Sequence, residues 1–143
     1  MYNLNNFDIL INISNKGSVS KMNLYRIISD NEWTQSEKDG KVPRCNSDTR
    51  AGHIHLNKFD DIKTVANKYF ETAENPVVLE VEISSELYKK LIWEPSTKEK
   101  NWEQAHLLIE NIDMNDVKRY SYLIINDKID GQFEVGEFSS LTD

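Results

Sequence analysis

The sequence predicts one domain of the α+β class, on three observations. Segments with strand-like and helix-like patterns mix along the chain without the regular alternation that a doubly wound parallel sheet requires. The chain has 143 residues, which is the length of one compact domain. Its composition, 38% hydrophobic and 29% charged, is typical of a globular protein. We expect residues 1–21 to form an N-terminal arm or added strand and residues 22–143 to form the domain.

The first elements follow from local patterns. Residues 22–28, MNLYRII, have the aromatic and β-branched character of a strand. Ser29 and Glu32 stand at capping-box spacing and predict a helix that begins at Ser29 and ends near Gly40. Residues 41–51 contain one proline, several turn formers and no apolar periodicity, so we expect an exposed loop there.

The middle of the chain predicts a strand, a helix and a second strand. The strand is GHIHLN, residues 52–57. The helix spans residues 60–73, with Asp60 or Asp61 as its cap and one apolar face formed by Ile62, Val65, Ala66, Tyr69, Phe70 and Ala73. Residues 76–83 alternate as a half-buried strand does, which directs Val77, Leu79, Val81 and Ile83 to the core and leaves Glu80 and Glu82 in solvent.

The last third of the chain predicts further strands. Residues 90–95 form a strand that its final proline ends. Residues 105–112 and 119–125 are strand candidates, separated by a helical turn that Asp113 caps. We expect residues 131–138 to close the sheet as an edge strand.

Charge and cysteine content restrict the partners. The net charge of −7, with no dense cluster of lysine and arginine, argues against nucleic acid. A small phosphorylated ligand is compatible with it, because one or two arginines in a pocket can hold such a ligand. Cys45 is the sole cysteine, so no internal disulfide can form and a cytoplasmic location is expected. The apolar runs are too short to span a membrane, so no membrane partner is expected.

The candidate chemistry lies in polar residues on apolar strands. The chain has no glycine-rich phosphate loop, CxxC, HExxH or GxSxG motif. In an extended strand His53 and His55 point to the same side, away from the core. With His106 from another strand they would supply three nitrogen ligands of a zinc site, and two histidines on a solvated edge are the alternative. Arg26 is either a fixed guanidinium for a phosphate or ribose, or an ordinary solvent-exposed charge.

Five segments in order resemble a known bacterial family, the domain of unknown function family 952. They are LYRIISDNEW, GHIHLNKFDDIKTVANKYF, PVVLEVEI, LIWEP and HLLIENIDMNDV. The resemblance extends from about Leu24 to Leu123. That family resembles the ADP-ribosyltransferase fold, a small split, twisted β structure with flanking helices, and is similar in plan to RNA 2′-phosphotransferases that use NAD. The resemblance implies a cleft that binds NAD or a related ADP-ribose nucleotide.

The resemblance also implies roles for individual residues. Its motifs match at Tyr25 and Ile27, at Gly52 with Ile54, His55 and Leu56, at Trp93 with Glu94 and Pro95, and at His106 with Leu107. It implies catalytic roles for His55, His106 and Glu94, and NAD contacts by Arg26, Tyr25, His53, Asn57 and Trp93. Arg26 stands where the family has histidine, and the Tyr-Gly-Pro that usually follows His106-Leu107 is absent. An aromatic residue is usual at the position of His53, which disfavours a metal clamp, so no metal is expected.

Several functions therefore stay open at the level of sequence. The first is an ADP-ribosyltransferase or NAD-cleaving enzyme, and the second is a nucleotide-binding module without chemistry. A third is a protein-interaction domain that uses the acidic surface and the N-terminal arm. A metal-dependent hydrolase is the fourth.

Overall fold

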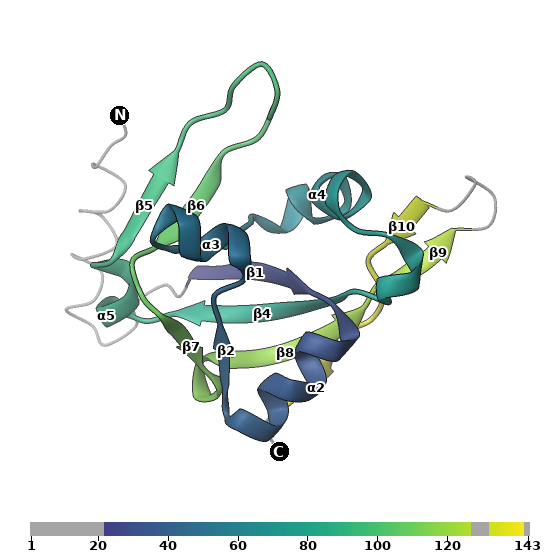
Figure 1. Ribbon diagram of the computed structural model, residues 1–143, viewed down its shortest axis with the longest axis horizontal. Helices are drawn as coiled ribbons and strands as arrows, with labels where there is room; N and C mark the ends of the chain where they lie inside the picture. Colours follow the sequence, from purple (N-terminus) through teal and green to yellow (C-terminus); the bar gives the residue numbers. More distant parts are fainter. Residues whose placement is uncertain (1–21, 127–131, 142–143) are drawn as a thin grey trace, which may run out of the picture.

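The computed structural model of the chain describes residues 22–126 and 132–141. Within these ranges the chain forms a mixed α+β fold with four α-helices and several small antiparallel sheets (Figure 1). The predicted α+β class is therefore confirmed. The predicted N-terminal arm, residues 1–21, lies outside the described residues.

The largest sheet has the strand order β1-β4-β8-β11. Its strands are β1 (Met22–Ile28), β4 (Val77–Ile83), β8 (Val117–Tyr122) and β11 (Ser139–Ser140), and all neighbours are antiparallel. Strand β1 is thus an edge strand of this sheet, and β4 is central.

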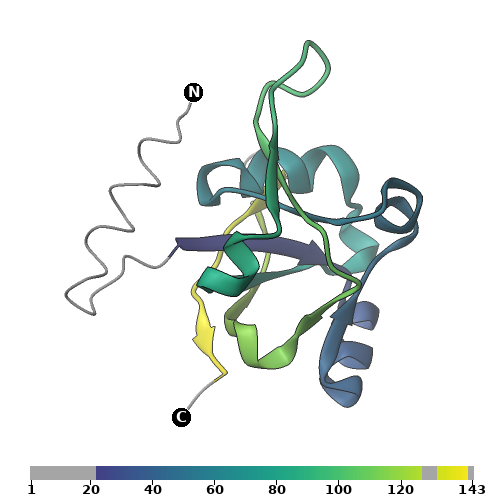
Figure 2. The same cartoon turned by 90° about the vertical axis from the view of Figure 1, so that its left-hand side faces the viewer.

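A smaller sheet has the order β3-β6-β5. It is formed by β3 (Ile54–Leu56), β6 (Gln104–Leu107) and β5 (Leu91–Glu94), and the connection between β5 and β6 projects from the body of the molecule (Figures 1 and 2). A bridge between Tyr25 and Asn57 joins the two sheets, because the backbone N–H of each donates to the carbonyl of the other at 2.8 Å. The outer edge of β1 is therefore paired at Tyr25.

Two further strand pairs lie outside these two sheets. One joins β2 (Lys41–Pro43) to β7 (Asn111–Asp113), and the other joins β9 (Ile124–Asn126) to β10 (Gln132–Glu134). The predicted edge strand in residues 131–138 is confirmed in part. Residues 132–134 pair with β9, whereas the edge of the large sheet is β11.

Local sequence explains where the helices begin and end. Helix α2 (Asp30–Asp39) begins at a complete capping box of Ser29 and Glu32 and ends at Gly40, whose φ of 75° suits glycine. Both predicted boundaries are confirmed. The other helices are α3 (Asn46–Ala51), α4 (Ile62–Tyr69) and α5 (Ser85–Tyr88), and a 3₁₀ turn at Met114–Asp116 is capped by Asp113 as predicted.

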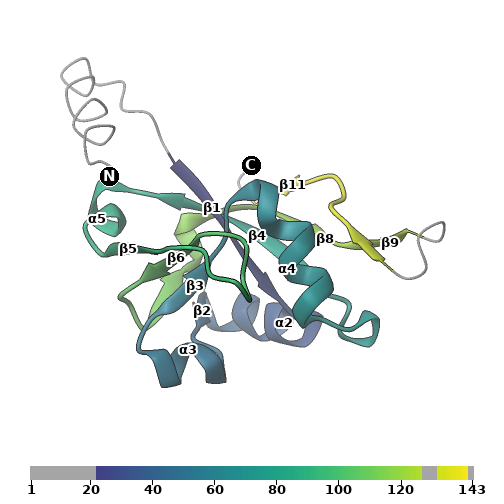
Figure 3. The same cartoon turned by 90° about the horizontal axis from the view of Figure 1, so that it is seen from above.

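Apolar side chains cover both faces of the large sheet. On one face the buried residues of β1 and β4 pack against α2 and the inner face of the small sheet: Leu24, Ile28, Trp33, Ile54, Leu56, Val77, Leu79, Val81, Ala105 and Leu107. The other face packs against α4 (Figure 3), through Tyr25, Ile27, Val78, Ile62, Val65 and Ala66. The predicted alternation is confirmed in β3, the strand that contains His55, because Ile54 and Leu56 are fully buried.

The predicted loop at residues 41–51 is wrong, because this segment contains β2 and α3. Helix α3 lacks an apolar face, and the buried residue that anchors it is the charged Asp48. A local apolar pattern therefore could not reveal the helix.

The predicted solvent position of Glu80 is also wrong, since Glu80 is only 4% exposed. It lies in a row across the sheet with Tyr25 and Arg119. Arg119 donates two hydrogen bonds to the Glu80 carboxylate, both at 2.8 Å, and the Tyr25 hydroxyl donates a third at 2.9 Å. The alternating sequence pattern predicted the wrong environment for Glu80 because both faces of β4 are covered by other parts of the protein.

Several predicted boundaries need smaller corrections. Residues 105–112 are not one strand, since β6 ends at Leu107 and β7 begins at Asn111. Residues 119–125 contain the break between β8 and β9. Helix α4 ends earlier than predicted, and Tyr69 is 52% exposed.

No helix in residues 22–126 and 132–141 combines the length and the apolar character needed to cross a membrane.

We expect Glu80→Ala to lower the free energy of unfolding by about 2–3 kcal/mol, because it leaves the buried Tyr25 hydroxyl without its acceptor and Arg119 without its carboxylate. Urea unfolding followed by circular dichroism measures this. Glu86→Ala is the matched control, since Glu86 is largely exposed and should change stability by less than about 0.5 kcal/mol. Equal effects of the two substitutions would contradict the predicted role of Glu80.

Candidate functional site

The three histidines meet on the outer face of the small sheet. The register pairs His55 of β3 with His106 of β6, and His53 stands two residues before His55 on the same side. The rings of His53 and His106 are stacked with centroids 3.7 Å apart, and each lies 4.8 Å from the ring of His55. These are all the histidines of the chain.

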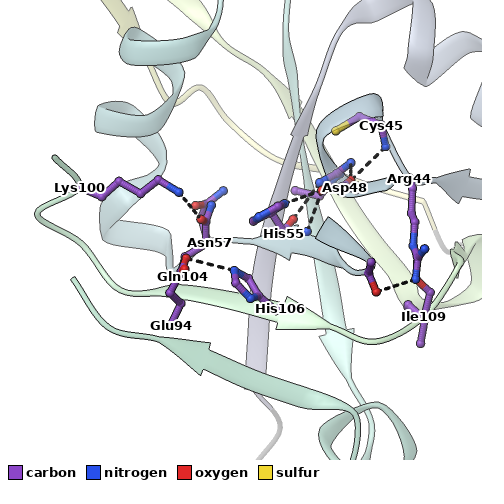
Figure 4. Close-up of polar contacts among 12 residues, drawn as sticks. Arg44, Cys45, Asp48, His55, Asn57, Glu94, Lys100, Gln104, His106 and Ile109 are labelled. Atoms are coloured by element: carbon purple, nitrogen blue, oxygen red, sulfur yellow. Dashed lines mark hydrogen bonds and ion pairs between the residues drawn. The ribbon is translucent and has the colours of Figure 1, made fainter. Parts of the chain in front are cut away.

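The buried carboxylate of Asp48, on α3, holds β3 in place through hydrogen bonds with His55 (Figure 4). Its Oδ1 accepts from His55 Nδ1 at 2.5 Å and from the His55 backbone N–H at 3.2 Å. Its Oδ2 accepts from the Cys45 backbone N–H at 3.0 Å. Because a carboxylate only accepts, the tautomer of His55 that makes this hydrogen bond has its proton on Nδ1 and its lone pair on Nε2.

Arg26 is the cation that balances Asp48. Its Nη2 pairs with Asp48 Oδ2, and its Nη1 donates to the His55 carbonyl at 2.9 Å. The residue is only 5% exposed, so the solvent-exposed interpretation of Arg26 is wrong. The guanidinium is fixed, and two of its three nitrogens are occupied by the protein itself.

Burial and charge shift the pKa values of these groups. Burial alone would raise the pKa of Asp48, but the hydrogen bond from His55 and the positive charge of Arg26 hold it well below its usual range. Burial, with the neighbouring His53 and His55, lowers the pKa of His106 to about 4. Burial and the proximity of His55 lower the pKa of His53 as well. At neutral pH His106 is therefore uncharged and Asp48 is ionised.

Glu94 of β5 lies beside the histidines. Its Oε1 is 3.3 Å from His106 Nε2 (Figure 4), but the two groups are not aligned as a hydrogen bond. The Nε2 atoms of His53 and His106 are buried, and neither has a hydrogen-bond partner within the described residues. The cluster thus presents buried nitrogens whose hydrogen-bonding capacity is unused.

A pocket of about 380 Å³ opens next to His55. It follows the outer edge of β1 beyond the Tyr25–Asn57 bridge, with α3 on one side and α4 on the other. The residues that matter chemically are Arg26, Ile27, Asp48, His55, Asn57 and Lys100. The Oδ1 atom of Asn57 is buried and has no hydrogen-bond partner in the described part of the chain.

The predicted site residues fall into three groups. Arg26, His55 and Asn57 line the pocket. His53 and His106 adjoin His55, and Glu94 adjoins His106, but none of the three is in the lining. The third group, Tyr25 and Trp93, lies elsewhere.

Tyr25 and Trp93 both point away from the histidines. Tyr25 packs under α4 and donates to Glu80, and burial together with that carboxylate raises the pKa of Tyr25 to about 12. Trp93 alternates with Glu94 on β5, so it occupies the core-facing side, where Lys58 Nζ lies 5.2 Å from its ring centroid. The structure does not bring either residue to the pocket.

Sequence reasoning missed Asp48 and Lys100. Asp48 lay in a segment predicted to be a loop, and Lys100 lay in a polar connection. For Asp48 the neighbouring residues carried no signal, because its cation Arg26 lies 22 positions away. Lys100 is bonded locally, since its ammonium donates to Gln104 at the start of β6, but no pattern in the sequence showed that the connection reaches the pocket.

We expect the free energy of unfolding to fall as the pH decreases from about 7 to 5 in buffer that contains a chelator. The unfolded chain takes up a proton near the ordinary histidine pKa of 6.5, whereas folded His106 does not until about pH 4. Each such proton contributes a slope of up to about 1.4 kcal/mol per pH unit. Urea unfolding at several pH values measures the slope, and His106→Gln should reduce it. An unchanged slope in the variant would contradict this assignment.

We expect Asp48→Ala to cost about 3–5 kcal/mol in unfolding free energy, because Arg26 remains as a buried, unpaired charge. Adding Arg26→Met should recover part of the loss, since the double variant buries no charge at that position. Asp39→Ala, at an exposed position of α2, is the matched control and should be nearly neutral. Thermal and urea unfolding of the single and double variants measure these losses. If the loss of unfolding free energy in the double variant equals the sum of the two single losses, Asp48 and Arg26 are not coupled.

Comparisons with known proteins agree with this fold. Residues 27–120 match the family model described as Protein of unknown function (DUF952). The chain is similar to the X-ray crystal structure of protein CC0527 from Caulobacter crescentus, with 27% identity, a TM-score of 0.66, and coverage of 79% of this chain and 94% of that one. For the solution NMR structure of CC0527 the identity is 26%, the TM-score 0.61, and the coverage 74% and 88%. No curated protein matches the chain. This chain therefore belongs to the DUF952 family.

Proposed function

We propose that the pocket beside His55 binds the nicotinamide-ribose end of NAD, or the corresponding part of a related ADP-ribose nucleotide. The observation that carries this proposal is that three residues line one pocket: Ile27 on the outer edge of β1, Asn57 and His55.

The backbone edge provides a paired donor and acceptor. The N–H and C=O of Tyr25 point outward, since both bond to Asn57. Residues two apart on a strand direct these groups to the same edge, so those of Ile27 also point outward, into the pocket. A ligand amide, such as the carboxamide of nicotinamide, has an N–H that can donate to the Ile27 carbonyl and a C=O that can accept from the Ile27 N–H.

The size and charge of the pocket fit one end of a dinucleotide. A volume of about 380 Å³ suits a nucleoside-sized group, so the rest of NAD would extend toward solvent. Apart from His55, the charged lining residues are the cations Arg26 and Lys100 and the carboxylates Glu32, Asp48 and Glu74, which is two positive charges against three negative ones. A net negative lining favours the positively charged nicotinamide ring, and the aromatic rings of Tyr69 and Phe70 offer apolar walls.

His55 is the residue that we assign to chemistry. Cleavage breaks the bond between the ribose C1′ and the nicotinamide nitrogen, and the electron pair leaves with neutral nicotinamide. Positive charge then develops on the ribose, and the ionised carboxylates of the lining stabilise it. Water or another hydroxyl attacks C1′ and gives its proton to His55 Nε2, while Asp48 on Nδ1 stabilises the resulting imidazolium. The ring of His106 lies against that of His55, and Glu94 lies beside His106, so we assign both residues to supporting His55.

A resemblance to a fold known for NAD chemistry also supports this assignment. Two antiparallel sheets joined at one bridge, with helices around them, resemble the split β structure of the ADP-ribosyltransferase fold. Likeness of fold is an analogy, so the proposal depends on the residues of the pocket.

The second candidate is a nucleotide-binding module without turnover. One observation favours it: Arg26 donates to Asp48 and to the His55 carbonyl, which leaves Nε as its one nitrogen without a partner in the described residues. Such a guanidinium has little capacity left to hold a phosphate. Release of nicotinamide separates this candidate from the enzyme.

We expect NAD or ADP-ribose to raise the melting temperature of the protein, in a panel that also contains NADP, cyclic ADP-ribose and mononucleotides. Lys100→Glu replaces a lining cation by a carboxylate that repels the pyrophosphate of both ligands, and it should reduce the stabilisation. Lys98→Glu, exposed in the same connection and outside the lining, should not. Chromatography of NAD incubated with wild type and with His55→Asn tests turnover, and nicotinamide should appear with wild type alone.

Two outcomes would count against the proposal in different ways. Ligand binding without nicotinamide release identifies the binding module. If no nucleotide of the panel shifts the melting temperature, the pocket is not a nucleotide site, and a protein partner becomes the leading function.

A further inference from the structure

We propose that His53, His55 and His106 together bind a divalent transition-metal ion of the zinc type. All three histidines of the chain lie in this one cluster, and a ligand nitrogen from each lies within 4.8 Å of the other two. Three imidazoles are a common ligand set for zinc in sites that leave a fourth position open. The proposal is independent of the nucleotide pocket.

The environment of His55 supports a metal ligand. Its Nδ1 donates to the Asp48 carboxylate, which fixes the ring orientation and leaves the Nε2 lone pair available. A carboxylate on the far nitrogen of a histidine is the usual support of a metal-bound imidazole, and it increases the basicity of the ligand. Arg26 and the Cys45 N–H hold the Asp48 carboxylate in turn.

The other two histidines present unused nitrogens. The Nε2 atoms of His53 and His106 are buried and have no hydrogen-bond partner among residues 22–126 and 132–141. A buried polar atom without a partner costs free energy, and coordination of a metal ion removes that cost. The same cluster thus contains one ligand that the protein already orients and two that lack a partner.

Binding requires one side chain to move. The rings of His53 and His106 are stacked, with an interplanar angle of 14° and centroids 3.7 Å apart. A metal ion lies near the plane of each imidazole that binds it, so two parallel rings at this separation cannot share an ion. His53 precedes β3 and is partly exposed, so its ring is the one that turns out of the stack.

Glu94 is the candidate for the fourth ligand of the ion. Its Oε1 is 3.3 Å from His106 Nε2, so a small rotation would bring the carboxylate to an ion held by the three rings. Nitrogen and carboxylate donors suit Zn²⁺ and Co²⁺ better than Mg²⁺ or Ca²⁺, which prefer ligand sets made of oxygen.

Metal binding and the proposed chemistry of His55 exclude each other. An ion on His55 Nε2 occupies the lone pair that would otherwise accept the proton. This consequence rests on the proposed function, and a bound ion should therefore inhibit any release of nicotinamide.

The test uses the full-length chain without an affinity tag, since any added histidine would compete. After treatment with a chelator, Zn²⁺ binding is measured by calorimetry, and Co²⁺ binding by its visible absorption. We expect one equivalent of Zn²⁺ and a Co²⁺ spectrum of tetrahedral or five-coordinate type. His53→Phe keeps a ring that can stack on His106 but removes the nitrogen, and it should weaken Zn²⁺ binding at least tenfold.

His106→Gln is the second variant and should also weaken Zn²⁺ binding, whereas Glu86→Gln, at an exposed position of α5, is the control and should not. The proposal is overturned if wild type binds no stoichiometric Zn²⁺, or if His53→Phe binds it as tightly as wild type. His53→Phe decides the question even if His106→Gln fails to fold. All these measurements are made without nucleotide, so their result leaves the test of the pocket untouched.

Discussion

The arrangement of the site depends on the buried carboxylate of Asp48. It accepts hydrogen bonds from Arg26, from the ring and backbone of His55, and from the backbone of Cys45. One side chain thereby links β1, β3 and α3. The six residues of α3 are too few for an independently stable helix, and Asp48 is its buried residue, so this ionic contact also holds the helix in place. Burial of the charge is tolerated because a cation and several N–H donors surround it.

Two adjacent residues of β1 connect the layers around this contact. The Tyr25 backbone joins the small sheet at Asn57, and its side chain points to the α4 face, where it meets Glu80 and Arg119. Arg26 points to the opposite face and meets Asp48. Successive residues of a strand point to opposite faces, so one dipeptide fixes the large sheet against the small sheet, α3 and α4. The pocket forms where these parts meet.

Elements with a local cause could be predicted from the sequence, and elements with a distant partner could not. The capping box at Ser29 and the alternation at Ile54 and Leu56 are local, and both predictions were confirmed. Asp48 was missed because the cation that makes its burial tolerable lies 22 positions away on β1. Glu80 was misplaced because alternation assumes one face in water, and a central strand covered on both sides does not meet that assumption.

For the candidate site, the resemblance to the family implied roles for His55 and His106, but only the fold explains why they meet. Their pairing depends on the register of β3 and β6, which no local pattern encodes. The same register brings His53 against His106. The side chains of Tyr25 and Trp93 point away from the histidines because of strand alternation, which becomes clear once the covered face of each strand is known.

The edges of the large sheet have a consequence for the behaviour of the protein in solution. Unpaired strand edges invite addition of strands from other molecules, which leads to aggregation. On β1 the outward groups are paired at Tyr25, and those of Ile27 lie in a pocket walled by α3 and α4. The opposite edge, β11, is only two residues long. An extended chain has no room to lie along the outward groups of Ile27 between these walls, so the walls that define the pocket also shield this part of the sheet edge from strand addition.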